Sequence, residues 1–120
     1  MRLIRPRVAV CAFAAFVLGT CGDGGTAPEE CTGTCIEVSN ISTLTVDEVK
    51  FSACGNSDWG SNRLGSGEIA PGEARVWAVT AACWDISAVA PFNGQFCGNT
   101  EYGVDVAAGS TYVMEYHGCP

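Results

Sequence analysis

The sequence predicts an all-β protein whose folded part is a small antiparallel β-sandwich of immunoglobulin-like or related architecture. Short runs with strand-like composition recur between turn residues, and no stretch keeps a helical period for more than about two turns. The first twenty residues have the layout of an export signal. Six cysteines are spread over the last ninety residues, and cysteines of exported chains usually form disulfides. We therefore expect a disulfide-stapled domain behind a signal peptide and a flexible tether.

The N-terminal segment predicts export. Three arginines in the first seven residues precede an apolar run of eleven residues at 8–18. This length suits the core of a signal peptide and is too short for a membrane-spanning helix, which needs roughly twenty residues. The segment resembles the lipobox of bacterial lipoproteins, in which cleavage exposes a cysteine that carries lipid, although Thr20 replaces the usual Gly, Ala or Ser. We expect residues 1–20 to be the signal peptide and Cys21 to be lipidated, with acyl chains such as palmitate.

The cysteine count agrees with lipidation. Cys11 leaves with the signal peptide, and if Cys21 is acylated, an even number of cysteines remains for pairing. If Cys21 stays a thiol, one cysteine is left over. We expect Cys54 to pair with Cys83, because both lie at ends of predicted strands that flank a long Gly-rich loop, and the other pairings stay open. The disulfide candidates are Cys31, Cys35, Cys54, Cys83, Cys97 and Cys119.

Composition divides the rest of the chain into a tether at 21–34 and a domain at 35–120. Residues 22–30 are mostly small, acidic or helix-breaking and have no apolar period, which is typical of a flexible linker. Three basic and thirteen acidic residues follow position 20, a net charge of −10. A surface this acidic repels nucleic acid, so no nucleic-acid partner is expected. The simplest explanation of the negative charge is that it keeps the protein soluble.

Six segments have the composition of strands. In the last one, Tyr112, Met114 and Tyr116 share one face, so we expect that face to be buried. Residues 70–73 read Ala-Pro-Gly-Glu, which suits a type II turn, and residues 93–94 read Asn-Gly, which suits a tight hairpin. The predicted strands are 35–41, 46–53, 74–80, 83–90, 103–106 and 111–117.

A long Gly-rich loop at 54–69 lies at the centre of a distinctive series of residues. In chain order, the series is Val38, Asn40, Val49, Phe51, Cys54, Trp59, Gly60, Asn62, Leu64, Gly65, Ile69, Pro71, Gly72, Glu73, Cys83, Trp84, Asp85 and Ile86. This order resembles a group of small secreted bacterial domains with Trp-Gly and Leu-Gly motifs, known mainly as proteins of unknown function. The resemblance covers roughly 36–106. It implies a β-sandwich and no known chemistry.

No residue is assigned to catalysis. His117 is the only histidine, lies at the end of the last predicted strand and has no nucleophile-elbow pattern near it in the sequence. Carboxylates could form an acid–base pair, but the sequence places no two of them together. We therefore expect a protein that is not an enzyme, and a small hydrolase would need these groups in one cleft. The carboxylates expected to be half-buried are Asp58, Asp85, Glu101 and Asp105.

Metal and cofactor sites are not expected. Cys31 and Cys35 have the spacing of half a zinc site, but the chain has no second such pair. Asp47, Glu48 and Asp58 offer the oxygen ligands that Ca²⁺ prefers, but the spacing of an EF-hand is missing.

The candidate binding residues are Trp59, Asn62 and Arg63, all in the long loop. A tryptophan on a loop can grip a sugar face or a partner protein, or it can fold back and close the end of the sandwich. The sequence therefore predicts a bacterial cell-envelope lipoprotein, lipid-anchored in the periplasm or at the outer surface, that is a non-catalytic binding or structural module. The alternative is a freely secreted β-domain that binds carbohydrate or protein.

Overall fold

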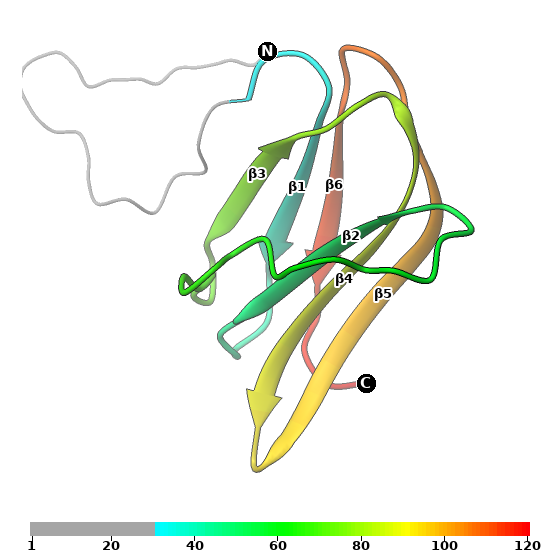
Figure 1. Cartoon of the computed structure of the whole chain (residues 1–120). Helices are drawn as coiled ribbons and strands as arrows, with labels where there is room; N and C mark the ends of the chain where they lie inside the picture. The colour runs from blue at the N-terminus through cyan, green and yellow to red at the C-terminus, as the bar shows by residue number, and fades with distance from the viewer. Residues whose placement is uncertain (1–30) are drawn as a thin grey trace, which may run out of the picture.

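The computed structural model describes residues 31–120, which form six strands (Figure 1). The predicted signal peptide at 1–20, Cys21 and the tether up to residue 30 lie outside the described residues. The strands are β1 (Cys35–Asn40), β2 (Glu48–Ala53), β3 (Ala74–Ala78), β4 (Ala82–Phe92), β5 (Gln95–Val106) and β6 (Thr111–Tyr116). The prediction of an all-β chain is confirmed for the described part.

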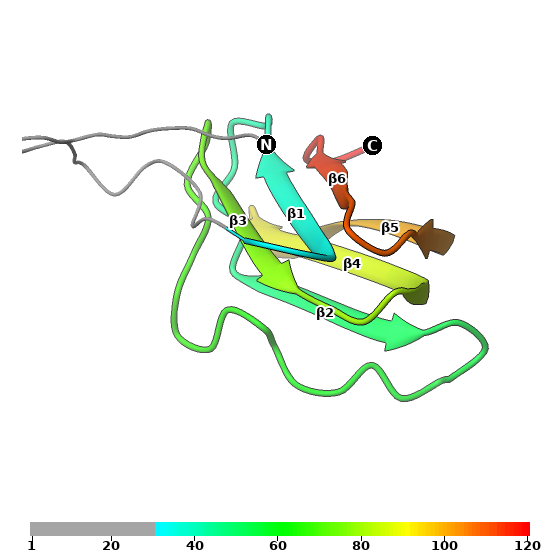
Figure 2. The same ribbon diagram turned by 90° about the horizontal axis from the view of Figure 1, so that it is seen from above.

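The strands form two three-stranded sheets that face each other (Figure 2). One sheet has the order β3-β1-β6 and the other the order β2-β4-β5. The prediction of antiparallel sheets is right for every pair except β1 and β6, which run parallel. A tight hairpin forces two strands to be antiparallel, but β1 and β6 are the first and last strands and no short connection joins them.

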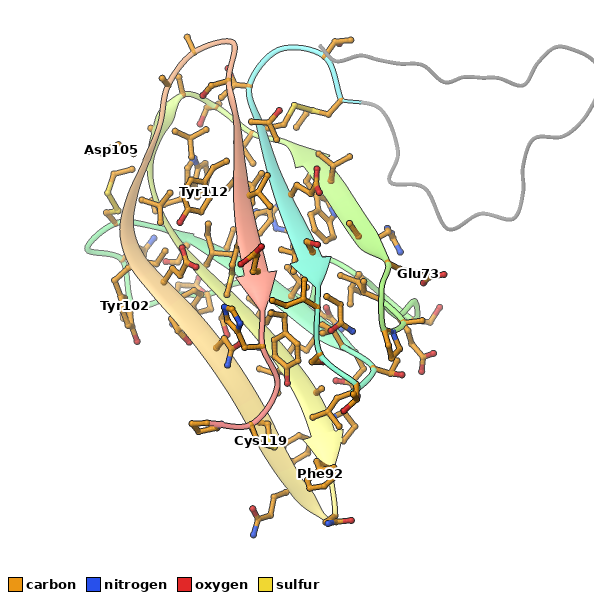
Figure 3. All side chains as sticks on the ribbon, turned by 180° about the vertical axis from the view of Figure 1, so that it is seen from behind. Glu73, Phe92, Tyr102, Asp105, Tyr112 and Cys119 are labelled. Carbon is orange, nitrogen blue, oxygen red and sulfur yellow. A yellow bond between two sulfur atoms is a disulfide. The ribbon has the colours of Figure 1, made fainter. Side chains whose placement is uncertain are left out.

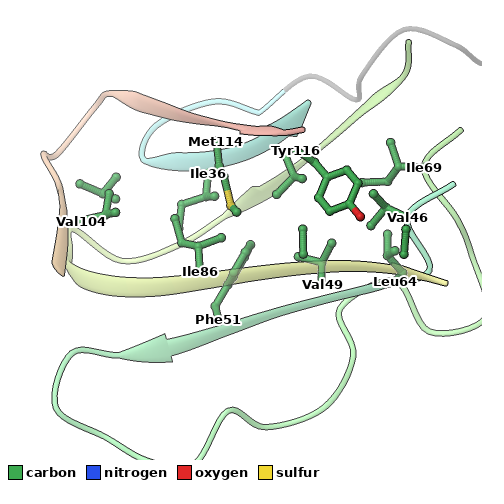
Figure 4. Close-up of a cluster of buried hydrophobic side chains, with 14 residues drawn as sticks. Ile36, Val46, Val49, Phe51, Leu64, Ile69, Ile86, Val104, Met114 and Tyr116 are labelled. Atoms are coloured by element: carbon green, nitrogen blue, oxygen red, sulfur yellow. The ribbon is translucent and has the colours of Figure 1, made fainter. Parts of the chain in front are cut away.

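The core lies between the two sheets (Figure 4). The β6 alternation is confirmed, because Met114 and Tyr116 are fully buried, Tyr112 is half-buried and Val113 between them is 47% exposed. Both sheets and the long loop contribute to the core. Its buried members are Ile36, Val38, Val46, Val49, Phe51, Leu64, Ile69, Ile86, Ala88, Ala90, Val104, Val106, Met114 and Tyr116.

Both predicted turns are present. Gly72 has a φ of +84°, and the Glu73 N–H donates to the Ala70 carbonyl at 3.0 Å, as a type II turn requires. Asn93 and Gly94 have φ values of +52° and +76°, which fits a two-residue hairpin turn that suits the twist of the strands. The turn at 93–94 therefore joins β4 directly to β5.

The strand after this turn is longer than the predicted 103–106. Gly98, Asn99 and Gly103 lower the β propensity of this segment. Its pairing with β4 nevertheless runs from Phe92↔Gln95 to Ala82↔Val106, so tertiary pairing overrides the local preference.

The six cysteines of the described domain form three disulfides. The pairs are Cys31–Cys35, Cys54–Cys83 and Cys97–Cys119, so the pairing expected for Cys54 is the one found. Cys54–Cys83 joins the end of β2 to the start of β4, and Cys97–Cys119 joins β5 to the C-terminal segment. The first pair closes the entry to β1.

Candidate functional site

The long loop after β2 lies along the open edge of that strand. Asn62 carries this contact: its Oδ1 accepts the Val49 and Leu64 N–H groups at 2.9 and 3.0 Å, and its Nδ2 donates to the Asp47 carbonyl at 2.9 Å. The Arg63 N–H adds a bond to the Val49 carbonyl at 2.6 Å. An exposed sheet edge can pair with another chain, so this loop blunts that risk. The Asn62 amide, predicted as a binding group, is used by the fold.

Arg63 also serves the fold. Its guanidinium lies 4.7 Å from the centre of the Phe51 ring, a cation–π contact at the margin of the core. The loop thus uses two of its three candidate binding residues to cover β2.

Trp59 is placed differently from the other two tryptophans. Trp77 and Trp84 pack against the core, and their rings lie 5.4 and 6.4 Å from the Phe51 ring. Trp59 is half-buried outside the core cluster, and its ring centre lies 6.4 Å from that of Tyr102 with the planes at 67°. It is Leu64, not Trp59, that the loop inserts into the core.

Tyr102 is a site residue that sequence reasoning missed. It is 73% exposed on β5, at a β-bulge where Tyr102 and Gly103 together oppose Asp85 of β4. Gly103 has a φ of +68°, and the buried Asp85 carboxylate accepts its N–H at 2.9 Å. Bulges redirect side chains, and the Tyr102 ring beside this bulge contacts the Trp59 ring. The available signal was the glycine inside a strand-like run.

Short-range hydrogen bonds order the start of the loop. The Asn56 and Asp58 side chains each accept the N–H two residues ahead, at 2.9 and 3.0 Å, and these are Asx turns. The buried Ser52 hydroxyl donates to the Asn56 carbonyl at 2.8 Å. Together with the Cys54–Cys83 bridge, these bonds fix the segment that carries Trp59.

A second feature is a hollow of about 230 Å³ at the end of the domain that holds the β4–β5 hairpin. It has an exposed imidazole on one wall and the 46%-exposed Phe92 ring on another. The fold uses the backbone rather than the ring of His117: its N–H donates to Asn99 Oδ1 at 2.6 Å. The lining residues are Ser42, Thr43, Leu44, Phe92, His117, Gly118 and Cys119.

The carboxylates predicted to be half-buried divide into two groups. Asp85 is buried and Glu101 is half-buried, but Asp58 and Asp105 are exposed, so the prediction is wrong for these two, which lie on a loop and on the outer side of β5. Asp85 and Glu101 lie on opposite faces of the β2-β4-β5 sheet, as the alternation of β4 and β5 requires. Within 31–120, no three His, Cys, Asp or Glu side chains gather as metal ligands, Asp47 and Glu48 included.

Glu101 instead accepts a hydrogen bond from the Tyr112 hydroxyl and so links the two sheets. This bond, followed by burial and the carboxylate charge, raises the pKa of Tyr112 to about 12. Burial also raises the pKa of Tyr116, whose hydroxyl donates to the Cys97 carbonyl at 2.6 Å. The β5–β6 side of the domain is thus closed by side chains rather than by a strand ladder.

The Tyr112 shift predicts weaker folding in alkali. A tyrosine with a raised folded pKa contributes stability that is complete below its unfolded pKa of 10 and is lost as pH rises toward 12. After allowance for solvent screening, we expect the wild type to lose about 1 kcal/mol more than Tyr112→Phe between pH 9 and pH 11. Urea unfolding at each pH measures this. Tyr102→Phe is the control and should keep the wild-type slope; an unchanged slope in Tyr112→Phe contradicts the prediction.

Comparison with known proteins identifies no similar protein. The chain matches no protein-family model, no curated protein and no solved structure. The resemblance drawn from the order of residues at 36–106 therefore stays a prediction. Over 31–120 there is no helix with the length and apolar character needed to cross a bilayer.

Proposed function

We propose that this chain is a cell-envelope lipoprotein of bacterial type, a small non-catalytic binding or structural module tethered through an acylated Cys21. The observation that carries the proposal is the disulfide pattern. The six cysteines at 31–120 pair among themselves, so none of them is left to pair with Cys21. A cysteine at the predicted cleavage point, without a partner among these six, suits lipidation.

The arrangement of the domain supports a tethered role. The described chain enters beside the β5–β6 connection, where the Cys35 N–H donates to the Ser110 carbonyl at 2.9 Å. The turn at 93–94 lies at the other end of the sheets (Figure 1). A domain attached through residues 21–30 would therefore hold its β4–β5 hairpin away from a membrane. Two acyl chains or more would give a stable anchor, since one gives only marginal binding.

The architecture proposed for this domain is a sandwich of immunoglobulin-like or related type. Two facing three-stranded sheets with one core between them support it. The proposed relationship to small secreted bacterial domains of unknown function rests on the order of residues alone.

A second candidate function is a freely secreted β-domain that binds carbohydrate or protein. The observation that favours it is the Trp59–Tyr102 pair, which lies outside the core and leaves Tyr102 exposed. This candidate needs no lipid on Cys21.

The intact mass of the mature product separates the two candidates. The full-length chain is expressed in a bacterial host with and without Cys21→Ser. We expect the wild type to have the mass of 21–120 plus acyl groups, less the six hydrogens lost in three disulfides, and to partition with membranes. Cys21→Ser should lack the acyl mass. A wild-type product without acyl mass would contradict the lipoprotein proposal and favour the secreted one.

A further inference from the structure

We propose that the outer face around the Trp59–Tyr102 pair binds a basic peptide segment of another protein through its arginine and lysine side chains. This aromatic–acidic surface comprises Trp59, Tyr102, Asp58 and Asp105. The inference names a ligand for the binding role proposed above and rests on that role, but it does not depend on the lipid anchor.

The two rings are available to a ligand. Their centres are 6.4 Å apart with the planes at 67°, so one edge faces the other ring and aromatic area remains uncovered. Tyr102 is 73% exposed. Trp59 is half-buried, and neither ring belongs to the core cluster, so a ligand that covers them would not disturb the core.

Two exposed carboxylates lie on the same side of the domain as the ring pair. Asp58 precedes Trp59 in the loop and is exposed, and Asp105 is exposed on the same outer side of β5 as Tyr102 (Figure 3). Asp85 lies beneath the bulge, where its Oδ1 accepts the Gly103 N–H. A cation above the rings would therefore approach negative charge as well as aromatic faces.

The domain's own cations are engaged elsewhere. Residues 31–120 contain ten acidic and three basic side chains. Lys50 pairs with Glu48 at 2.8 Å, the Arg63 guanidinium lies 4.7 Å from the Phe51 ring centre, and that of Arg75 lies 5.8 Å from the Trp77 ring centre. In this part of the chain, neither Trp59 nor Tyr102 has a cation over its ring. The excess charge thus complements a basic partner, which would also be steered toward it.

The surface is built before a ligand arrives. The Cys54–Cys83 bridge and the Asx turns at Asn56 and Asp58 hold Trp59, and the bulge holds Tyr102. A pre-organised site loses less conformational entropy on binding than a mobile loop. Charge and rings together favour a basic peptide over a neutral sugar. A sugar hydroxyl can only form short-range hydrogen bonds with a carboxylate, whereas an arginine or lysine is also attracted by the net negative charge of the domain.

The test uses the Cys21→Ser protein with residues 1–20 removed, so that neither lipid nor signal peptide holds it to a membrane during titration. A fluorescein-labelled peptide of alternating arginine and glycine is the probe, with a glutamine–glycine peptide for comparison, and fluorescence anisotropy is read at low and physiological salt. Oligomers of glucose and of N-acetylglucosamine are titrated separately by calorimetry. Each variant is first checked for three disulfides by mass and for an unchanged thermal midpoint.

We expect the arginine peptide to bind and the glutamine peptide not to bind. Tyr102→Ala should weaken binding about fivefold through loss of a cation–π face, and Asp105→Asn about threefold. Tyr102→Phe keeps the ring and should stay within about twofold. The matched controls are Phe96→Ala, an exposed ring elsewhere on β5, and Glu115→Gln, an exposed carboxylate on the other sheet; both should also stay within about twofold.

Three outcomes would overturn the proposal. Absence of peptide binding is the first. The second is equal weakening by the controls, which would mean a general attraction to a polyanion. The third is Tyr102-dependent binding of an oligosaccharide without the peptide, which would make the surface a carbohydrate site. Failure of the lipid anchor is read separately from the mass of the wild-type product and leaves this assay unaffected.

Discussion

Replacing Asn40 by alanine is expected to lower the free energy of unfolding by about 3 kcal/mol. Asn40 is fully buried at the end of β1, and its Nδ2 donates to the Leu44 and Ile69 carbonyls at 2.7 and 2.9 Å. Its Oδ1 accepts from the Ser42 N–H and hydroxyl at 2.9 and 2.6 Å. Alanine removes all four bonds at a buried position. The Leu44 and Ile69 carbonyls then keep one donor each, the Ser42 hydroxyl at 3.3 Å and the Val46 N–H at 3.0 Å, so the loss comes from several bonds together and exceeds that of one average hydrogen bond. Urea unfolding with intact disulfides measures the loss.

Two variants give this prediction its controls. Asn99→Ala removes a partly exposed amide that binds the His117 N–H and the Gly118 carbonyl, so water can replace it and a loss of about 1 kcal/mol is expected. Asn40→Asp keeps the acceptor but replaces the donor to the Leu44 and Ile69 carbonyls by a second acceptor, so it should be at least as harmful as alanine. A loss for Asn40→Ala no larger than for Asn99→Ala would show that the β1–β2 connection does not need this amide.

Local chemistry made the turns and the strand faces predictable. A Pro-Gly pair and an Asn-Gly pair each fix a backbone conformation through two adjacent residues, and both turns are found. The alternation of Tyr112, Met114 and Tyr116 likewise needs only one strand and one core. These features depend on neighbours in the sequence, so no tertiary information was needed.

Features that depend on distant partners escaped prediction. The parallel pairing of β1 and β6 brings together the first and last strands of the domain, so it depends on the path of all the strands between them. The length of β5 depends on β4, since its own glycines and asparagine argue against a strand. Local sequence contains neither partner, and single-strand preference is weak compared with pairing.

The candidate site shows the same limit. Loop composition selected Trp59, Asn62 and Arg63 together. In the structure, however, the Asn62 amide is hydrogen-bonded to the backbone of β2, and the Arg63 guanidinium lies over the Phe51 ring. Tyr102 lies far along the chain, and it contacts Trp59 at a β-bulge that the sequence analysis did not predict. The sequence pattern identified the loop, but only the tertiary contacts show which of its side chains remain available to a partner.

Removing the Cys54–Cys83 bridge by alanine at both positions is expected to cost about 3.5 kcal/mol. The bridge spans 29 positions, and the entropy it removes from the unfolded chain grows with the logarithm of that length. The Cys31–Cys35 bridge spans 4 positions, and the same relation gives about 2 kcal/mol for its double alanine variant. Urea unfolding of both variants measures the difference; equal losses, or a larger loss for the short bridge, would contradict an entropic origin.

The Cys54–Cys83 variant also connects stability to the proposed binding surface. Ala53 pairs with Trp84, so the sheet ladder holds β2 and β4 together without the disulfide, and the core should survive its loss. The loop that begins at Cys54 has no such ladder until Asn62 reaches β2. Its first part should therefore become mobile, exposing Trp59 and shifting its fluorescence to the red, while the Cys31–Cys35 variant leaves Trp59 unchanged. Peptide binding by the aromatic–acidic surface should also weaken in the Cys54–Cys83 variant. A mobile Trp59 ring must be ordered when the peptide binds, and this loss of conformational entropy lowers the affinity.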